Sequence, residues 1–306
     1  MSADSNHTSG CDASFAQCNC VGEELNGDIR LSLFDRIRYL VRNFRRNVAL
    51  PAVRLSTRPF CLGGADEADG TPSPGRLLGQ AFVREELPRL LARSDIRVLD
   101  VGCGSGRMSH HLARAGFRGT YVGVDIDDRF SPDDAGSEGF VRRFIHGNAH
   151  DLPERETYDL VFSNSALEHI PDDRRLLEKL DRLVAPGGMQ MHIVPSGWGL
   201  ALYLWHGYRQ YPLSRIGSLF AGGRTQVYRL GGLTCFMVHL IFISLGEILL
   251  RLRLRDRFPR AYRSLLNRAF MVDRMLAVCP GMYVICQRAR LAHENPVVTR
   301  SIADPR

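Results

Sequence analysis

The stretch VLDVGCGSG, residues 98–106, is a short apolar run followed by three glycines that alternate with small side chains. An apolar strand that ends in glycines lets the backbone come close to a ligand. The helix that follows such a loop directs its N-terminus toward the same ligand. The stretch therefore predicts a ligand-binding turn between a buried strand and a helix.

The spacing of the loop residues separates three candidate ligands: a triphosphate, a dinucleotide and S-adenosylmethionine. A P-loop requires Gly-x-x-x-x-Gly-Lys-Ser/Thr, and no lysine follows here. The third glycine of the dinucleotide fingerprint Gly-x-Gly-x-x-Gly would fall on Arg107. Asp100 stands two residues before the first glycine, where a carboxylate repels a pyrophosphate but suits an ammonium and a sulfonium group. The spacing favours S-adenosylmethionine.

Strands and helices alternate on both sides of this loop. A helix is expected over 77–93 before the strand, and a second helix ends at Gly116. Further strands are expected at 120–127, 143–146, 158–165, 189–195 and, as a late antiparallel strand, 282–288. This alternation predicts an α/β fold: a doubly wound, Rossmann-like, mostly parallel sheet with helical additions at the N-terminus and after the fifth strand.

Composition divides the 306 residues into five parts. The polar N-terminus has no apolar signal-peptide core, and the eight cysteines show no regular framework, so we expect a cytoplasmic chain with free thiols. The parts are a disordered tail (1–28), a basic amphipathic helix with a linker (29–76), the ligand-binding core (77–195), an acceptor-side helical region with the final strand (196–290) and a second tail (291–306).

The charge is distributed unevenly along the chain. Residues 61–195 hold 22 acids against 16 bases, whereas residues 196–306 hold 16 arginines against five acids. Of the 40 basic residues only Lys179 is a lysine, a bias that is more typical of codon composition than of phosphate binding. An acidic core beside a basic C-terminal part suits an anionic surface or substrate better than nucleic acid, so no nucleic-acid partner is expected.

Residues 77–195 resemble the class I S-adenosylmethionine-dependent methyltransferases, in the small-molecule branch with a methyltransferase type 11-like domain. The motifs that carry the resemblance are, in chain order, VLDVGCGSG, GVDID, GNAHDLP, YDLVFSNSALEHI and LVAPGG. The resemblance implies that Asp100 orients the cofactor's ammonium group, that Asp125 binds both ribose hydroxyls, and that Asn148 with Ala149 borders the adenine. The other cofactor-binding residues that it implies are Gly102, Cys103, Gly104, Ser105, Gly106, Ile126 and Ser163.

Methyl transfer to a hydroxyl requires a general base within hydrogen-bond reach. Glu168 and His169 follow the fourth strand, at the sheet edge where such folds bind substrates, and His169 is the best candidate base. It could equally be a histidine that only packs or caps the helix. Some ubiquinone-pathway O-methyltransferases carry Glu-x-x-Glu-His here, but Ser165 replaces the first glutamate, so no metal is expected.

Two regions after the fifth strand predict contact with an apolar acceptor or a membrane. Residues 195–215 hold both tryptophans and His206, a weaker candidate base, and either line an acceptor pocket or cover the sheet edge. Residues 233–250 are apolar but too short to span a bilayer, so they form a core or an interfacial helix. Together with the arginine-rich helix at 31–48, they predict an anionic membrane surface as a partner, at the inner face of the membrane.

These residues together predict a methyltransferase that acts on a small-molecule, lipid or glycan-precursor acceptor at oxygen. Two alternatives from other classes remain open. One is a non-catalytic subunit that binds S-adenosylmethionine without consuming it. The other is a nicotinamide-dependent oxidoreductase, which Arg107 at the third glycine position disfavours.

Overall fold

Eight strands form one sheet in the order β3-β9-β10-β8-β7-β4-β5-β6. The computed structural model describes residues 20–21, 24–51, 55–62, 71–131, 139–220 and 224–289. The strands of this sheet are β3 (Thr57–Phe60), β4 (Asp95–Val101), β5 (Arg118–Asp125), β6 (Phe140–His146), β7 (Tyr158–Asn164), β8 (Val184–Pro195), β9 (Arg224–Leu230) and β10 (Met282–Arg288). A separate antiparallel pair joins β1 (Cys20–Val21) to β2 (Glu24–Leu25).

The directions of the strands confirm the predicted fold class. Five neighbouring strands run parallel to one another: β6, β5, β4, β7 and β8. Strand β10 lies between β8 and β9 and is antiparallel to both. The late strand expected at 282–288 is therefore confirmed. The sequence reading missed β3 and β9, which pair in parallel and extend the sheet beyond β10.

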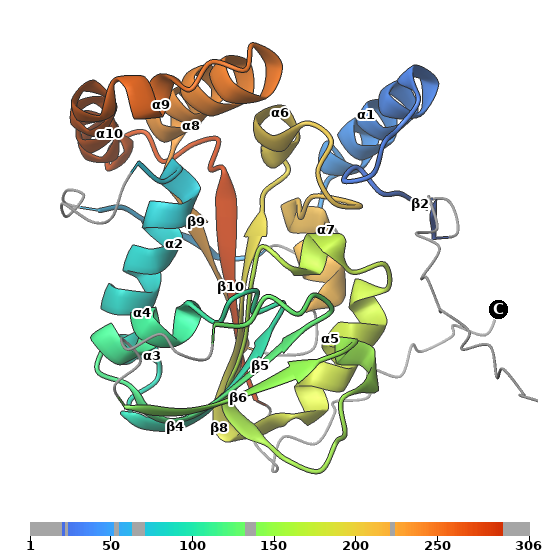
Figure 1. The fold of residues 1–306 in the computed structure, drawn as a ribbon, viewed down its shortest axis with the longest axis vertical. Coiled ribbons are helices and arrows are strands. Elements are labelled where there is room, and N and C mark those ends of the chain that lie inside the picture. Colours follow the sequence, from blue (N-terminus) through green and yellow to red (C-terminus); the bar gives the residue numbers. More distant parts are fainter. Residues whose placement is uncertain are drawn as a thin grey trace, which may run out of the picture.

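Helices cover both faces of the sheet and crowd one end of it (Figure 1). On one face lie α2 (Pro74–Glu85), α3 (Leu87–Leu90) and α4 (Met108–Arg114), and on the other lie α5 (Asp173–Arg182) and α7 (Leu213–Leu219). The expected helix at 77–93 is divided, because a proline at position 88 cannot continue the hydrogen-bond ladder of α2. At the upper end stand α1 (Leu33–Asn47), α6 (Gly199–Tyr203), α8 (Leu233–His239), the π-helix η3 (Leu240–Leu249), α9 (Leu254–Arg257) and α10 (Pro259–Asp273).

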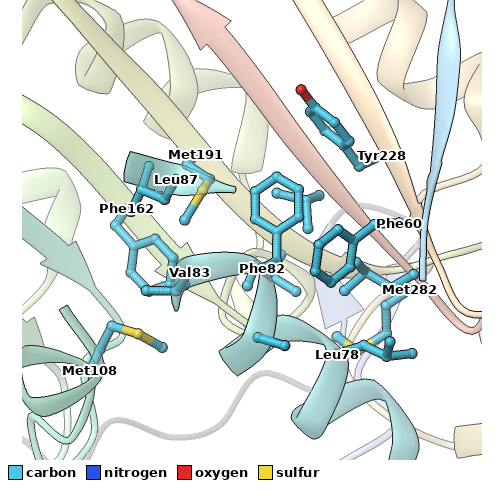
Figure 2. Packing of buried hydrophobic residues seen from close by; sticks show 14 of the residues in the cluster. Phe60, Leu78, Phe82, Val83, Leu87, Met108, Phe162, Met191, Tyr228 and Met282 are labelled. Atoms are coloured by element: carbon cyan, nitrogen blue, oxygen red, sulfur yellow. The ribbon is translucent and has the colours of Figure 1, made fainter. Parts of the chain in front are cut away.

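Aromatic packing holds helix α2 against strands β3 and β9 of the sheet. The ring of Phe82 lies edge-on to Phe60 of β3, with centroids 5.1 Å apart, and to Tyr228 of β9 at 4.8 Å (Figure 2). Phe82 is fully buried, and burial of such a side chain contributes about 1.5–3 kcal/mol. This packing attaches the two unexpected strands to the predicted core.

The end of the expected N-terminal tail is docked onto the protein. The Gly27 amide donates to the Gly207 carbonyl at 2.7 Å, and Glu24 forms an ion pair with the buried guanidinium of Arg209. Arg209 also donates to the Ile170 carbonyl at 2.7 Å. Residues 24–28 therefore belong to the folded part, whereas residues 1–19 and the expected tail at 291–306 lie outside the described residues.

The apolar stretch at 233–250 forms α8 and then η3, with one side against the protein. Cys235, Val238 and Ile243 are buried, whereas Met237 and Ile241 on the other side are 41% and 47% exposed. No helix in the described ranges combines the length and the apolar character that crossing a bilayer requires. The stretch is thus a half-covered helix, intermediate between the two alternatives that its sequence left open.

Candidate functional site

A cavity of about 610 Å³ opens at the carboxyl ends of β4, β5, β6 and β7. Each of these strands ends in a loop that contributes to the wall, because parallel strands bring their carboxyl ends to one edge of the sheet. The wall includes Gly102 and Gly104 after β4, Asp125 and Ile126 after β5, Gly147, Asn148 and Ala149 after β6, and Ser165, Ala166, His169 and Ile170 after β7.

The glycine loop takes its shape from left-handed backbone conformations. Gly102 has φ +72° and Gly104 has φ +54°, values that side chains other than glycine rarely adopt. A Cβ on Gly102 would lie 2.4 Å from the Cβ of Ala166, whereas a Cβ on Gly104 would meet no atom within 4 Å. Gly102 therefore allows the β4 and β7 loops to pack together, and Gly104 presents bare backbone to the cavity.

The Asp125 carboxylate lies directly beside this loop. One of its oxygens accepts the Gly104 amide at 2.7 Å, and the other accepts the Asp127 amide at 3.0 Å. Each carboxylate oxygen can accept a second hydrogen bond. Asp125 can therefore hold the loop and still receive two hydroxyl groups from a ligand.

The β6 loop and Ile126 form the far side of the cavity. Asn148 caps the short helix η1 (Ala149–Asp151) by accepting the His150 amide at 3.0 Å through its side-chain oxygen. Ile126 is 71% exposed although it is a large apolar residue. An exposed apolar side chain beside capped backbone suits the flat face of a heteroaromatic ring.

Several of the sequence-predicted residues do not reach the wall, and Asp100 is one of them. Its carboxylate is 2% exposed and accepts a hydrogen bond from the Tyr121 hydroxyl. Burial, helped by the charge of Asp125, raises the pKa of Asp100 to about 7 despite this hydrogen bond. Asp100 thus lies beneath the loop rather than in the cavity.

Cys103, Gly106 and Ser163 are also turned toward the interior. The thiol of Cys103 lies over Gly123, and burial together with the charge of Asp100 raises its pKa well above the usual range. A Cβ on Gly106 would lie 2.5 Å from the Phe144 ring. The hydroxyl of Ser163 is buried in the sheet, 2.8 Å from the Nδ1 atom of His192. The motif spacing placed these residues near the cavity but could not show which way each one faces.

Ser105 and Glu168 complete this group. Ser105 contacts the neighbouring loop through its carbonyl, which accepts the Ser131 amide at 3.3 Å. Glu168 is 1% exposed, its Oε2 atom has no hydrogen-bond partner among the described residues, and burial raises its pKa. A buried carboxyl without a partner is costly to ionise.

His169 stands at the cavity mouth in a cluster that the sequence did not predict. Its Nδ1 atom is 2.7 Å from the Asp28 carboxylate, and the ring lies edge-on to His206 at 4.6 Å between centroids. The Nδ1 atom of His206 is 3.2 Å from the other Asp28 oxygen. Asp28 also accepts the Gly207 amide at 3.0 Å, so one carboxylate holds both imidazoles.

These contacts change the acidity of the pair. Burial opposes ionisation of Asp28, but hydrogen bonds from His169, His206 and Gly207 outweigh it and hold its pKa far below the usual range. Burial likewise opposes the charged form of His169, yet the hydrogen bond to Asp28 and the charge of Glu168 raise its pKa. The arrangement fixes the ring and makes it a stronger base.

The same cluster brings together three groups that can bind a metal. One ligand atom each from Glu168, His169 and His206 lies within 4.8 Å of the others. The sequence comparison with Glu-x-x-Glu-His could not show this set, because His206 comes from a distant segment. The expectation that no metal is bound therefore stays a prediction.

Sequence reasoning missed the N-terminal contribution to the site. Asn26 and Asp28 line the cavity, although they lie in a polar stretch that reads as a tail. Asp127 and Arg129 also line it and pair at 2.7 Å. A polar segment has no apolar periodicity from which its packing against the rest of the protein could be predicted. Nothing in the sequence around Asp28 therefore indicated that it lines the cavity.

The aromatic segment after β8 divides between the core and the site. Tyr208 and Tyr211 are buried, whereas Trp198 is 52% exposed. Tyr203 lies 5.6 Å from His206 between ring centroids. Some rings of this segment therefore cover the sheet, as one alternative expected, and an acceptor pocket lined by the others stays a prediction.

The core of this chain is similar to known methyltransferases. Residues 78–222 match the family model described as a methyltransferase domain. The chain is 31% identical over 128 residues to trans-aconitate 2-methyltransferase of Deinococcus radiodurans, covering 42% of this chain and 46% of the relative. It is 28% identical over 142 residues to demethylmenaquinone methyltransferase of Staphylococcus aureus, covering 44% and 58%.

A third relative is the ubiquinone biosynthesis O-methyltransferase of Rhizobium etli. The identity is 33% over 98 residues, covering 31% of this chain and 39% of the relative. The chain thus spans about half the length of the curated relatives that it matches.

Proposed function

On the premise that residues 78–222 form a class I S-adenosylmethionine-dependent methyltransferase domain, we propose that this protein methylates a hydroxyl oxygen of a lipid-class small molecule with His169 as the base. The observation that carries this proposal is the Asp28–His169 pair at the mouth of the cavity. The O-methyltransferase named among the matched relatives supports oxygen as the target atom.

The residues of the cavity fit S-adenosylmethionine. The space above Gly104 and Gly147 is open, so backbone can contact the ligand there. Asp125 would take the ribose hydroxyls, and Ile126 with Asn148 would border the adenine. When bound, the cofactor supplies a methyl group that its sulfonium already activates.

The task left to the protein is to position the acceptor and remove its proton. Asp28 occupies the Nδ1 side of the His169 ring, which leaves Nε2 to accept a proton from the acceptor hydroxyl. A carboxylate that orients an imidazole in this way also stabilises the imidazolium that forms. The ring of His206 packs against His169 and limits its rotation.

A glycine substitution tests cofactor binding with a matched control. Gly104 and Gly116 both have a left-handed backbone, and a Cβ on either would enter open space, but only Gly104 lines the cavity. We expect Gly104→Ala to weaken S-adenosylmethionine binding about tenfold or more, because the methyl group occupies ligand space. Gly116→Ala has the same backbone strain and should leave the affinity unchanged. Calorimetry that finds equal affinity in both variants would refute the assignment of the cavity.

We also propose that the protein works at the surface of an anionic membrane, and α1 supplies the first observation. Its apolar side faces outward, with Leu33, Phe34, Ile37 and Phe44 between 54% and 75% exposed. The helix contacts the rest of the protein through its other side, where Tyr39 packs with Leu25 and Leu31 and polar groups form hydrogen bonds. The Tyr39 hydroxyl donates to the His206 carbonyl at 2.8 Å, and Asn47 donates to the Gly197 carbonyl at 3.0 Å.

A second apolar surface lies at the same end of the molecule. Helices α8, η3 and α10 stand there on the other side of α6 from α1 (Figure 1). Its exposed members include Met237, Ile241, Leu245, Ile248, Leu249, Leu250, Met271 and Met275. Apolar helices with arginines beside them lie in the interface of a bilayer and are attracted to anionic lipids. Such lipids line the cytoplasmic leaflet, so we place the protein there.

Flotation with liposomes tests this proposal. Phe34 and Phe44 are 74% and 61% exposed, so their joint replacement by serine should not disturb folding. We expect this double variant to bind anionic vesicles at least tenfold more weakly, because two rings no longer enter the bilayer. Val141→Ser is the control. Val141 is 74% exposed, but it lies on the edge strand β6 and belongs neither to α1 nor to the second apolar surface. Equal recovery of wild type with neutral and with anionic vesicles would contradict the proposal.

A further inference from the structure

A second cavity, of about 460 Å³, lies between the start of α2 and the helices α8, η3 and α9. Its wall includes Ser73, Arg76, Tyr203 and His239. Tyr203 separates it from the cluster at the cofactor cavity, because its ring lies 5.6 Å from His206 on one side and 5.0 Å from His239 on the other. Neither the predicted motifs nor the proposed methyl transfer uses this cavity.

His239 is the most unusual group in the wall. The side chain is 2% exposed, and its Nε2 atom has no hydrogen-bond partner among the described residues. Folded proteins rarely leave a buried polar atom without a partner. Burial and the nearby charge of Arg255 lower the pKa of His239 to about 4, so the ring is neutral at pH 7 and acts through a hydrogen bond.

The start of α2 adds further donors to the cavity. Ser73 caps this twelve-residue helix by accepting the Arg76 amide at 3.4 Å, which leaves its own hydroxyl proton free to be donated. The positive N-terminal end of the α2 dipole also favours an anion. The guanidinium of Arg76 pairs with no carboxylate in the part of the chain that the structure describes.

Tyr203 supplies another donor. Burial and the charge of Glu168 raise the pKa of Tyr203 far above its usual value, so its hydroxyl stays protonated.

Arg255 also lines the cavity, but its hydrogen bonds are made to the protein itself. Its guanidinium donates to both Glu247 oxygens at 2.6 Å and to the Thr71 carbonyl at 2.7 Å, which neutralises its charge. Asp256 contributes a carboxylate to the rim.

We propose that this cavity binds the phosphate group of a phosphorylated ligand. Polar groups of Ser73, Arg76, Tyr203 and His239 come from three separate segments, which suits a tetrahedral oxyanion, and the His239 ring donates to it in the tautomer that carries its proton on Nε2. The phosphate could belong to a lipid headgroup, since the exposed side of α8 and η3 adjoins the cavity, or to a soluble phosphate ester. The chemistry at the protein is the same for both, and experiment separates the sources.

Calorimetry with inorganic phosphate and with glycerol 3-phosphate on the full chain tests the proposal. Arg76→Gln should weaken both by about tenfold or more, because it removes the charge-assisted hydrogen bonds. His239→Phe keeps the ring shape but removes the unpaired nitrogen, and it should also weaken binding. Arg114→Gln is the control for net charge: Arg114 is exposed at the end of α4 and should be silent.

Vesicles then identify the source of the phosphate. If the ligand is a headgroup, Arg76→Gln will reduce flotation with phosphatidylcholine vesicles that contain phosphatidic acid, and Arg114→Gln will not. If the ligand is soluble, Arg76→Gln will lose glycerol 3-phosphate but float like wild type. Either result supports the site. If Arg76→Gln and Arg114→Gln behave alike in both assays, the proposal is wrong. Because calorimetry omits S-adenosylmethionine, failure here is independent of the proposed methyl transfer.

Discussion

Replacing His169 by glutamine is expected to slow methyl transfer by about 100-fold or more, the usual contribution of a general base. Glutamine can still bond to Asp28 but cannot accept the acceptor's proton. The rate can be followed as transfer of labelled methyl from S-adenosylmethionine into an extract of host lipids and metabolites. Cofactor affinity should stay unchanged in calorimetry, and His111→Gln on α4 serves as the control. An unchanged rate in His169→Gln would return this residue to a packing role.

The pH dependence separates catalysis from packing. The base works in its neutral form, and the pKa of His169 is raised by its partners. The rate should therefore rise with pH through a pKa above 6.5 and level off beyond it. Asp28→Asn removes the carboxylate that favours the imidazolium, so the rising limb should move to lower pH while the plateau falls. A limb that does not move would contradict the Asp28–His169 pair.

A chelator tests the alternative use of the same cluster. Glu168, His169 and His206 could together hold a divalent ion. With His169 as a free base, turnover should survive chelation. Strict loss of activity that a divalent ion restores would overturn the general-base mechanism, because a metal-bound imidazole cannot accept the proton.

Replacing Arg209 by methionine is expected to cost about 3–5 kcal/mol of the free energy of unfolding, as for a buried ion pair that loses one partner. The guanidinium is fully buried. It forms ion pairs with Glu24 and Asp173 and donates hydrogen bonds to the carbonyls of Ile170 and Pro171. Methionine would remove the donor to the Ile170 and Pro171 carbonyls. It would also remove one cation from Glu24, which keeps Arg46, and from Asp173, which keeps Arg215. Urea unfolding measures the change.

Arg182→Met is the matched control for this prediction. Arg182 and Glu154 form two hydrogen bonds of 2.8 Å, but their side chains are 57% and 40% exposed. Solvent and salt screen such exposed pairs, so Arg182→Met should change the free energy of unfolding far less than Arg209→Met does. A similar loss in Arg182→Met and Arg209→Met would show that Arg209 does not hold the segments together. If it does, Arg209→Met should also reduce activity, because Glu24 and Asp28 lie on the same docked segment.

Much of the fold could be read from local patterns in the chain. Apolar runs predicted the five parallel strands, and the run at 282–288 predicted the antiparallel one. Strand β9 was missed because Arg224–Leu230 mixes polar and apolar residues, and β3 because four residues carry too little periodicity. Both become strands through the neighbours that pair with them.

The orientation of α1 shows a limit of the same kind. Its sequence predicts an amphipathic helix, which usually turns its apolar side inward. In the structure Tyr39 and Asn43 face the protein, and the apolar side is exposed. Periodicity shows that the two sides of the helix differ, but which side is covered depends on the packing partners and hydrogen bonds that the neighbouring segments offer.

By itself the sequence determined the glycine loop, the acid at the end of β5 and the positions of the five parallel strands along the chain, because each depends on residues within a few positions of one another. Only the tertiary structure decided which of the predicted residues line the cavity, and it turned Ser163 and Asp100 inward. It also brought Asp28 to His169 across 141 positions. This contact between distant parts of the chain depends on the 206–209 segment, where Arg209 binds Glu24 and the Gly207 carbonyl accepts the Gly27 amide. No local sequence pattern predicts these contacts.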